Sequence, residues 1–386
     1  MRCESYEQEA VYKALVQGVE LLGGTGAFVC PGEKILLKPN MLAGRQPHLA
    51  VTTHPAVFEA AVRVFREGGA LLSYGDSPGY ENAKTVARKT GLGDAAHRLG
   101  VPAADFETPV LVSREDIPGI PGGKAVFPLA RGALEADGII SLPKMKTHGL
   151  TRITGAVKNQ LGCVTGFEKA RLHFLYPNPR RFASRLAAIT KILSPRLYIM
   201  DGISAMEGEG PAGGNPVGMN IILLSRDPVA LDTVFCRLID LSPAFVPTIK
   251  AAQDMGLGTS DEGSIKLAGE PPENFVKPDF DVVRRPVSGD TVFRLPSILR
   301  NRLIPRPVID KALCKKCGVC IRACPVEPRK AVNFPHGKNR FPVYAYGLCI
   351  RCFCCQEMCP HKAIHVKTPL SGRAFAGFLS ALRKKA

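Results

Sequence analysis

Short apolar runs alternate with longer amphipathic stretches from Lys34 to about Leu267. The run "KILLKPN" has the pattern of a strand that ends in a polar loop, and "HPAVFEAAVRVFREGGA" after it has the period of a helix that stops at glycine. "LLSYGDSPG", "ADGIISLPK", "PRLYIMDG" and "MNIILLSRD" indicate further strands, and "PVALDTVFCRLIDL" indicates a helix opened by Asp227 and Pro228. Strands that alternate with helices predict a layered α/β domain with a largely parallel sheet.

The pattern changes toward the C-terminus. Residues 277–310 are rich in proline and arginine and only weakly periodic, which is typical of a connector. The last residues, "GRAFAGFLSALRKKA", place apolar side chains on one helical face before a basic end, as in a docking helix or a membrane-surface helix. We predict four parts: an α/β domain at 1–276, a connector at 277–310, a small cysteine-rich α+β domain at 311–368 and a basic amphipathic tail at 369–386.

Composition narrows the class of protein. A chain of 386 residues favours two or three domains, and nine of its 13 cysteines fall between positions 314 and 359. Such crowding indicates metal ligation rather than a disulfide framework. The start "MRCESYEQEA" has no secretory pattern, and no run of 18 apolar residues occurs, so we expect a cytoplasmic protein without a transmembrane segment.

The formal net charge of +17 is unevenly placed. Residues 301–386 hold 17 lysines and arginines against three acidic residues, a balance of +14, which leaves +3 for the first 300 residues. Two iron-sulfur clusters with thiolate ligands would reduce the balance of this end to about +10. We therefore expect an acidic redox partner protein. Specific nucleic-acid binding is disfavoured because aromatic residues are few and tryptophan is absent.

The crowded cysteines form an internal repeat. "LCKKCGVCIRACP" at 313–325 and "LCIRCFCCQEMCP" at 348–360 align without gaps at an offset of 35, each as Leu-Cys-x2-Cys-x2-Cys-x3-Cys-Pro. Three thiolates at this spacing can hold three corners of an iron-sulfur cube, and in two-cluster ferredoxins the fourth cysteine ligates the other cluster. The first predicted [4Fe-4S] ligand set is Cys314, Cys317, Cys320 and Cys359. The second predicted [4Fe-4S] ligand set is Cys349, Cys352, Cys355 and Cys324.

Zinc is the alternative metal, because paired Cys-x2-Cys units also bind zinc, but the reciprocal fourth ligand has no role in a zinc site. Over roughly residues 308–366 the segment resembles the bacterial two-cluster ferredoxin domain, which implies one-electron transfer. Cys354 aligns with Val319 and is therefore the spare thiol, expected to pack as a small apolar side chain. The cations between the ligands either raise the potentials or dock an acidic donor, or else form a solvated face. These cations are Lys315, Lys316, Arg322 and Arg351.

Polar side chains follow the predicted strands of the α/β domain, at the positions where open parallel sheets bind their ligands. Repeated lysines at these ends indicate an anionic small molecule, such as a carboxylate or a phosphate. We predict catalytic roles for three residues of "LPKMKTH": Lys144, Lys146 and His148. We predict substrate-binding roles for five others: Lys38, Asn40, Asp76, Lys158 and Asn159. The stretch "TGAVKNQLGCVTG", which contains the last two, matches neither the dinucleotide motif nor the P-loop.

Several single residues have simpler interpretations beside the functional ones. His148 is either a general acid or base or an exposed loop imidazole. His54 and Asp227 are expected to cap the helices that follow them, and Cys163 to be a small buried thiol. Asp232 lies inside a predicted helix, where its role stays open.

The α/β stretches together resemble the family called domain of unknown function 362. The resemblance rests on "LLKPNM", "THP", "GDSPG", "LPKMKTH", "TGAVKNQLGCVTG", "MEGEGP" and "DPVALD", spread over about residues 34–235. It implies an α/β fold, a cytoplasmic location and an association with redox proteins. It assigns no catalytic residue.

Two functions follow from these patterns. The first is a redox enzyme, a ferredoxin-linked oxidoreductase, in which two [4Fe-4S] clusters exchange electrons with an anionic substrate or cofactor held by the α/β domain. The second is a non-catalytic electron carrier or adaptor whose α/β domain binds a partner protein or effector. The adaptor predicts that the basic residues at the strand ends point to solvent.

Overall fold

The computed structural model describes residues 1–79, 81–115, 124–166, 168–287 and 296–372. It divides into two compact units. The first, here the α/β unit, comprises Met1–Lys169 and Ala183–Pro286, and the second, here the C-terminal unit, comprises Ala170–Phe182 and Val287–Ala386. Each unit is described by itself.

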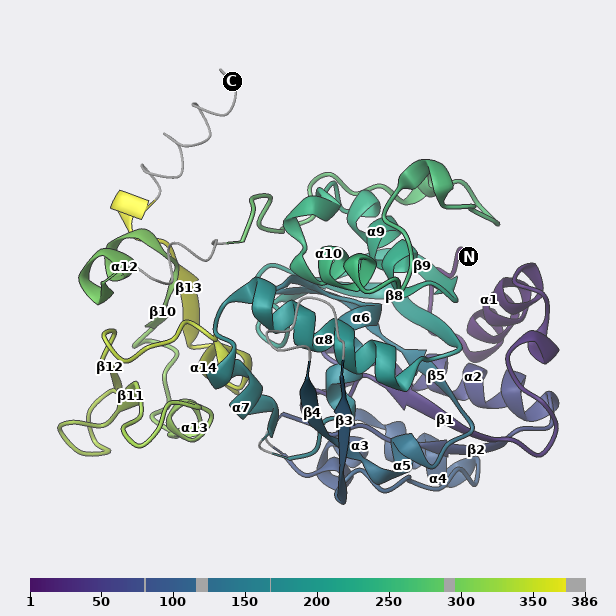
Figure 1. Ribbon diagram of the computed structural model, residues 1–386, viewed down its shortest axis with the longest axis horizontal. Coiled ribbons are helices and arrows are strands. Elements are labelled where there is room, and N and C mark those ends of the chain that lie inside the picture. Colours follow the sequence, from purple (N-terminus) through teal and green to yellow (C-terminus); the bar gives the residue numbers. More distant parts are fainter. Residues whose placement is uncertain (80, 116–123, 167, 288–295, 373–386) are drawn as a thin grey trace. The chain divides into compact units, whose positions relative to one another are not determined.

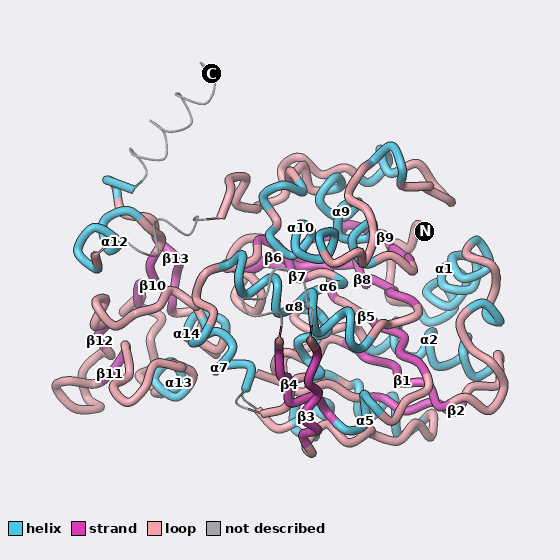
Figure 2. Tube along the Cα trace, viewed as in Figure 1, coloured by secondary structure: helices cyan, strands magenta, loops and turns pink. Residues whose placement is uncertain are grey.

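A seven-stranded sheet forms the centre of the α/β unit, with the strand order β2-β1-β5-β8-β6-β7 and with β9 paired to β8 (Figures 1 and 2). The strands are β1 (Lys34–Pro39), β2 (Leu71–Tyr74), β5 (Gly138–Leu142), β6 (Lys144–His148), β7 (Arg152–Thr154), β8 (Leu197–Glu207) and β9 (Asn215–Ser225). The pairs β1–β2, β1–β5, β5–β8 and β6–β8 are parallel, and β6–β7 and β8–β9 are antiparallel. The predicted layered α/β domain with a largely parallel sheet is confirmed.

Burial explains the apolar runs of the central strands. Every residue of β5 is buried, and in β1 only the first residue is exposed. Strands covered on both faces need apolar residues at consecutive positions, not at alternate ones. The chain leaves β1 toward β2 on one side, and β5 lies on the other side of β1. Loops that diverge in this way open a ligand-binding position at the carboxyl ends of the two strands.

Nine helices of the described part of the chain accompany these strands: α1 (Gln8–Leu21), α2 (Pro55–Glu67), α3 (Ala83–Thr90), α4 (Leu92–Arg98), α5 (Arg131–Leu134), α6 (Ala156–Asn159), α8 (Pro179–Leu193), α9 (Pro228–Leu238) and α10 (Pro247–Asp254). Most of α7 (Glu168–Leu175) belongs to the C-terminal unit. A separate antiparallel hairpin joins β3 (Pro109–Arg114) to β4 (Ala125–Ala130). Both predicted caps are confirmed. The His54 Nδ1 accepts a hydrogen bond from the Ala56 amide at the start of α2, and the Asp227 carboxylate accepts two at the start of α9.

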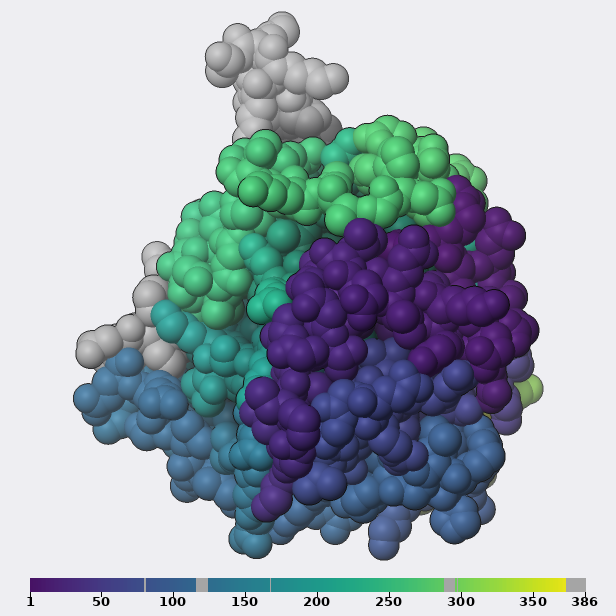
Figure 3. Space-filling view, turned by 90° about the vertical axis from the view of Figure 1, so that its right-hand side faces the viewer, coloured from purple at the N-terminus to yellow at the C-terminus, as the bar shows by residue number. Residues whose placement is uncertain are grey.

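The N-terminal residues are attached to the α/β unit at several points. The Cys3 amide donates to the Asn220 carbonyl oxygen (2.9 Å), and Arg2 pairs with Glu270 (2.9 Å). Figure 3 shows the two segments of that ion pair, purple and green, adjoining on one face. These contacts hold Tyr6 in place beside the sheet.

The C-terminal unit is small and built from short elements. These are α12 (Ser297–Leu303), β10 (Arg306–Ile309), α13 (Val319–Arg322), β11 (Val332–Asn333), β12 (Val343–Tyr344), α14 (Cys354–Glu357) and β13 (Ile364–Lys367). Strand β10 pairs with β13, and β11 with β12, both antiparallel. The α+β character expected of this part is confirmed, and the segment predicted as a connector ends in α12 and β10. The predicted tail helix lies, from residue 373 onward, outside the described residues.

The cysteine repeat is also a repeat of backbone conformation. Helices α13 and α14 occupy equivalent positions at the offset of 35. Lys316 and Arg351 both have positive φ angles, 55° and 63°, and so do the equivalent residues Gly318 and Phe353. Because L-residues rarely adopt this left-handed region, its recurrence shows that the ligand spacing imposes the same loop twice.

Candidate functional site

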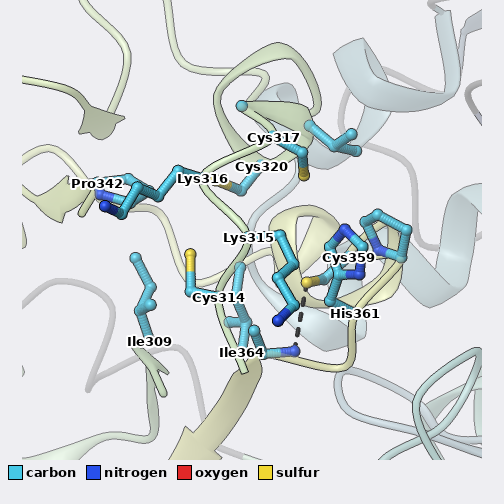
Figure 4. A pocket seen from close by; sticks show the side chains of 14 residues that line it. Ile309, Cys314, Lys315, Lys316, Cys317, Cys320, Pro342, Cys359, His361 and Ile364 are labelled. Atoms are coloured by element: carbon cyan, nitrogen blue, oxygen red, sulfur yellow. Dashed lines mark hydrogen bonds between the residues drawn. The ribbon is translucent and has the colours of Figure 1, made fainter. Parts of the chain in front are cut away.

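Four of the predicted thiol ligands line one cavity of the C-terminal unit. Cys314, Cys317 and Cys320 come from the loop before α13 and its first turn, and Cys359 reaches the same cavity from the second copy of the repeat (Figure 4). The apolar side chains of Ile309 and Ile364 close one side. We call these four cysteines the first quartet. The chain fold thus brings together the set expected from reciprocal ligation, with its crossing member.

The second quartet, Cys324, Cys349, Cys352 and Cys355, lies in more enclosed surroundings. All four residues are buried, each with 7% exposure. Three of them share one apolar core with Val332, Ile364 and neighbouring residues, and Cys324 again comes from the other copy. The Tyr344 hydroxyl donates a hydrogen bond to the Cys355 Sγ (3.1 Å). Cys354, the spare thiol, is buried in the first turn of α14 as expected for an apolar position.

The donor set fits iron-sulfur clusters. Burial and three neighbouring thiols raise the pKa of Cys320 to about 12, and burial also raises the pKa of Cys349. Such thiols become thiolates near neutral pH only when a cationic centre compensates their charge. Within the described ranges, no three His, Cys, Asp or Glu side chains converge closely enough to hold a single metal ion. Four thiols around one cavity match the four cysteine ligands of a [4Fe-4S] cluster.

Two equivalent cations of the repeat lie in different environments. Arg351 is buried at 2% exposure, donates to the Asn301 Oδ1 and lies 5.2 Å from the centre of the Tyr346 ring. Lys316 is only partly buried and donates to the Asn339 carbonyl oxygen (2.8 Å). The solvated-face interpretation is therefore wrong for Arg351.

In the α/β unit, four predicted binding residues and the predicted catalytic Lys146 form one buried network. The Lys38 Nζ pairs with the Asp76 Oδ1 (2.8 Å) and donates to the Asn159 Oδ1 (3.2 Å). The Asn40 side-chain amide donates to the same Asn159 oxygen (3.2 Å), and the Lys146 Nζ donates to the Asn40 Oδ1 (2.8 Å). All five residues are buried. We call them the charged network.

A second buried pair adjoins the charged network. The Lys144 Nζ lies 2.7 Å from the Asp201 Oδ2 and donates to the Tyr6 hydroxyl (2.8 Å), which itself donates to the Asp201 Oδ1 (2.8 Å). The Tyr6 ring stacks on the His54 ring at 3.6 Å. Burial lowers the pKa of Lys144, and it lowers the pKa of His54 to about 4. His54 is therefore neutral at physiological pH.

The loop before α2 connects the two groups. The Lys146 Nζ donates to the Val51 carbonyl oxygen (2.6 Å), and the His54 amide donates to the Asp201 Oδ2 (2.9 Å). Within the same loop the Thr53 hydroxyl donates to the Leu142 carbonyl oxygen (2.6 Å), at the end of β5. The lysines predicted from separate strand ends thus belong to one continuous polar region.

His148 and Lys158 are also buried. The Nδ1 of His148 accepts hydrogen bonds from the Leu150 and Thr151 amides (3.0 and 3.2 Å), so it supports the β6–β7 turn. It is not an exposed imidazole. Lys158 precedes Asn159 on α6, whose first amides donate to the Asp232 carboxylate at 2.7 and 3.3 Å. Asp232 is thus the residue that positions α6.

Two glycines of "TGAVKNQLGCVTG" are required by close approach to carboxylates. A Cβ atom on Gly162 would lie 1.7 Å from the Asp76 Oδ1, and one on Gly155 would lie 1.9 Å from the Asp232 Oδ1. No side chain fits at either distance. This stretch is therefore rich in glycine because it packs against buried charges, which explains why it matches no phosphate-binding motif.

A family model for a domain of unknown function, number 362, matches residues 35–237, more than half of the chain. The chain belongs to this family. A model of a 4Fe-4S dicluster domain matches residues 306–360. The C-terminal unit therefore contains a [4Fe-4S] domain of the electron-carrier type, and both resemblances seen in the sequence are confirmed.

Among relatives of this member of family 362 is the thylakoid-associated protein sll1697 of Synechocystis sp., 34% identical over 305 residues that cover 78% of this chain and 91% of that protein. Two solved structures, both 13% identical, are also similar. The lactate racemase apoprotein from Thermoanaerobacterium thermosaccharolyticum has a TM-score of 0.41, and a protein from Thermotoga maritima has 0.37. The two matches include 64% and 67% of this chain. They include 57% and 61% of the solved chains, so this chain spans less than two thirds of the length of each.

Three residues of the polar region were not among the predicted site residues of this family member. Tyr6 lies before α1, far in sequence from the sheet, and no pattern indicates its contact with Asp201. Asp201 follows the apolar start of β8. This position after an apolar strand segment is the same signal that predicted the other site residues, so it could have identified Asp201. Lys169 donates to the Ser77 and Val164 carbonyl oxygens (2.5 and 3.1 Å), and burial lowers its pKa to about 7.

Proposed function

We propose that this protein is a redox enzyme that binds two [4Fe-4S] clusters in its C-terminal unit. In this proposal it exchanges electrons with an anionic substrate or cofactor held by the α/β unit. The first quartet supports the two-cluster part, because it combines three cysteines of one run with the crossing cysteine of the other. In the second quartet, the crossing Cys324 shares an apolar core with Cys349 and Cys355. Clusters held by thiolates supply one-electron transfer. An acidic redox partner exchanges electrons with the clusters in a reducing, cytoplasmic compartment.

The burial of three lysines at one edge of the sheet carries the α/β part of the proposal. Lys38, Lys144 and Lys146 have no exposed surface. Buried ion pairs seldom stabilise a fold relative to apolar packing, and buried charges of this kind gather at functional sites. The adaptor function predicted basic residues that point to solvent, so the burial of these lysines disfavours it.

The proposed roles follow from the contacts of each residue. Lys38, Asn40, Asp76, Lys158 and Asn159 bind the anionic ligand, and Lys144, Lys146 and His148 exchange protons with it. Because the His148 Nδ1 accepts two amide hydrogen bonds, only its Nε2 can hold or release a proton. Lys38 is the cation that an incoming anion would share with Asp76.

The loaded protein tests this function directly. Anaerobically purified protein is reduced and mixed with small carboxylates and phosphates, and reoxidation of the iron-sulfur absorbance is followed. We expect at least one anion to reoxidise wild type but not Lys38→Met, with the same iron content in both. Equal reoxidation rates in wild type, Lys38→Met and Lys144→Met for every anion would support the adaptor instead.

Peripheral attachment to an anionic membrane is a second proposal. A relative is named as thylakoid-associated, and the C-terminal unit exposes Ile298, Leu299 and Leu370 near the cation Arg302. No helix among the described residues is long and apolar enough to span a membrane. Wild type should co-sediment with phosphatidylglycerol vesicles but not with neutral vesicles, and an Ile298→Gln, Leu299→Gln variant should bind them less.

A further inference from the structure

The two quartets differ in their access to solvent. In the first quartet Cys317 is exposed, and Cys314 and Cys359 are only partly buried. All members of the second quartet are buried. Electron transfer between proteins needs close approach of the two redox centres. The exposed quartet is therefore the one that an external partner can approach.

Several basic side chains lie beside the first quartet. Lys315 and Lys316 separate its first two ligands and line the same cavity (Figure 4). His361 also lines the cavity. Two further exposed lysines lie close in sequence to residues of the cavity: Lys311 precedes Cys314, and Lys362 follows His361. We call these residues, Lys311, Lys315, Lys316, His361 and Lys362, the basic rim.

Acidic residues do little to neutralise the basic rim. Of the three acids in residues 301–386, Glu327 pairs with Lys330 and Glu357 is buried. Asp310 accepts a hydrogen bond from the Ala312 amide and lies 3.8 Å from the His365 imidazole. The four lysines of the rim therefore outweigh the charge of about −2 that a cluster with four thiolate ligands would carry.

We propose that the basic rim is the docking surface for an acidic one-electron carrier and that electrons pass between this carrier and the protein at the first quartet. The proposal rests on the two-cluster part of the proposed function. When the reduced protein meets the oxidised carrier, the carrier gains one electron and the centre at the first quartet loses one. The enclosed second quartet would hold a centre that exchanges electrons with the centre at the first quartet and does not contact the carrier. Complementary charge accelerates such encounters and makes them sensitive to salt.

The equivalent loop of the repeat is unsuited to docking. Arg351 takes the place of Lys316, but its guanidinium is buried and hydrogen-bonded to Asn301. A buried cation cannot meet a partner surface, although it can stabilise negative charge inside the unit. We therefore assign docking to the first loop because its cations are accessible, and not because of the number of cations in each loop.

Stopped-flow mixing tests the proposal with a chosen probe. Reduced full-length protein is mixed anaerobically with an oxidised plant-type [2Fe-2S] ferredoxin, an acidic one-electron carrier, at about 0.05 and 0.3 M salt. We expect the second-order rate constant to fall severalfold with salt in wild type. At low salt, Lys315→Gln should lower it by about threefold or more, and Lys315→Glu should lower it further.

Lys367→Gln is the matched control. Lys367 is also an exposed lysine. It is the last residue of β13, whereas Ile364, the first residue of that strand, lines the cavity. This variant should change the rate by less than twofold. Equal effects of Lys315→Gln and Lys367→Gln, or a rate without salt dependence, would overturn the docking proposal. A variant that transfers electrons at the wild-type rate but binds anionic vesicles less would overturn it too, in favour of a membrane surface.

The iron content separates this test from that of the proposed function. All variants should hold about eight irons per chain, because the exposed side chains of Lys315 and Lys367 are not ligands. If wild type holds about four, the two-cluster function fails, and the docking proposal falls with it. If wild type holds about eight but Lys315 has no effect, only the docking proposal fails.

Discussion

The two cysteine loops of the C-terminal unit share their ligand spacing but not their surroundings. Both loops place left-handed residues at equivalent positions and begin a short helix at the same point. Around the first quartet, however, Cys317 is exposed and Ile309 lines the cavity. Around the second, the residue equivalent to Ile309 is Tyr344, which donates to a ligand sulfur. Spacing therefore sets what the loops can bind, and burial sets how each bound centre behaves.

The comparison depends first on which thiols are ligands. Replacing Cys355 by Ser should lower the iron content from about eight to about four per chain, because one quartet loses a corner. Cys354→Val should keep about eight, because Cys354 is buried at the position that Val319 occupies in the first loop. Iron quantification and electron paramagnetic resonance after reduction measure both variants. Loss of iron from Cys354→Val would show that the alignment assigns the spare thiol wrongly.

The second-largest expected difference between the two loops is their sensitivity to oxidants. Under limited air exposure, iron loss is expected in two phases, with Cys317 alkylated severalfold faster than Cys352, because Cys317 is exposed and Cys352 is buried. Mass spectrometry of iodoacetamide-treated samples follows each peptide. Simultaneous labelling of both cysteines would mean that the two loops open together.

The equivalent cations should differ in their effect on stability. Arg351→Met should lower the free energy of unfolding of the loaded protein by about 1–3 kcal/mol, because it removes the hydrogen bond from a buried guanidinium to the partly buried Asn301 Oδ1. Lys316→Met should change it by about 0.5 kcal/mol or less, because Lys316 is only partly buried. Denaturant unfolding under anaerobic conditions compares the two. Similar losses for both would contradict the difference in burial.

The smallest expected effect concerns the single hydrogen bond to sulfur. Tyr344→Phe should lower the midpoint potential of one of two centres by about 20–60 mV, because a donated hydrogen bond stabilises the more negative reduced form. A redox titration with spectroscopic detection measures it. Ile309→Val, at the equivalent position of the first loop, should shift neither potential. A shift of both centres in Tyr344→Phe would show that the hydroxyl does not act on one quartet alone.

Much of the α/β unit could be predicted because its signals are local. The buried strands β1 and β5 are continuous apolar runs in the sequence. The helices that begin at Pro55 and Pro228 are each preceded directly by their capping residue, His54 or Asp227. Position at the carboxyl ends of strands also identified Lys38, Asn40 and Lys146, which the fold brings together. The rest depends on contacts between distant segments. Tyr6 reaches Asp201 across 195 residues, and no periodicity reports such a contact.

The sequence by itself determined the ligand chemistry and the parallel sheet, because cysteine spacing and apolar periodicity act over a few residues. Only the tertiary structure decided which side chains lose their water. Lys144 and Arg351 are both cations that the sequence alone does not mark as buried, yet one lies beside Asp201 and the other beside Asn301, with almost no exposed surface. Burial is the sum of packing from many elements, so it follows from the folded chain and not from any one stretch. The same difference leaves Lys315 on the surface, where it can meet a partner.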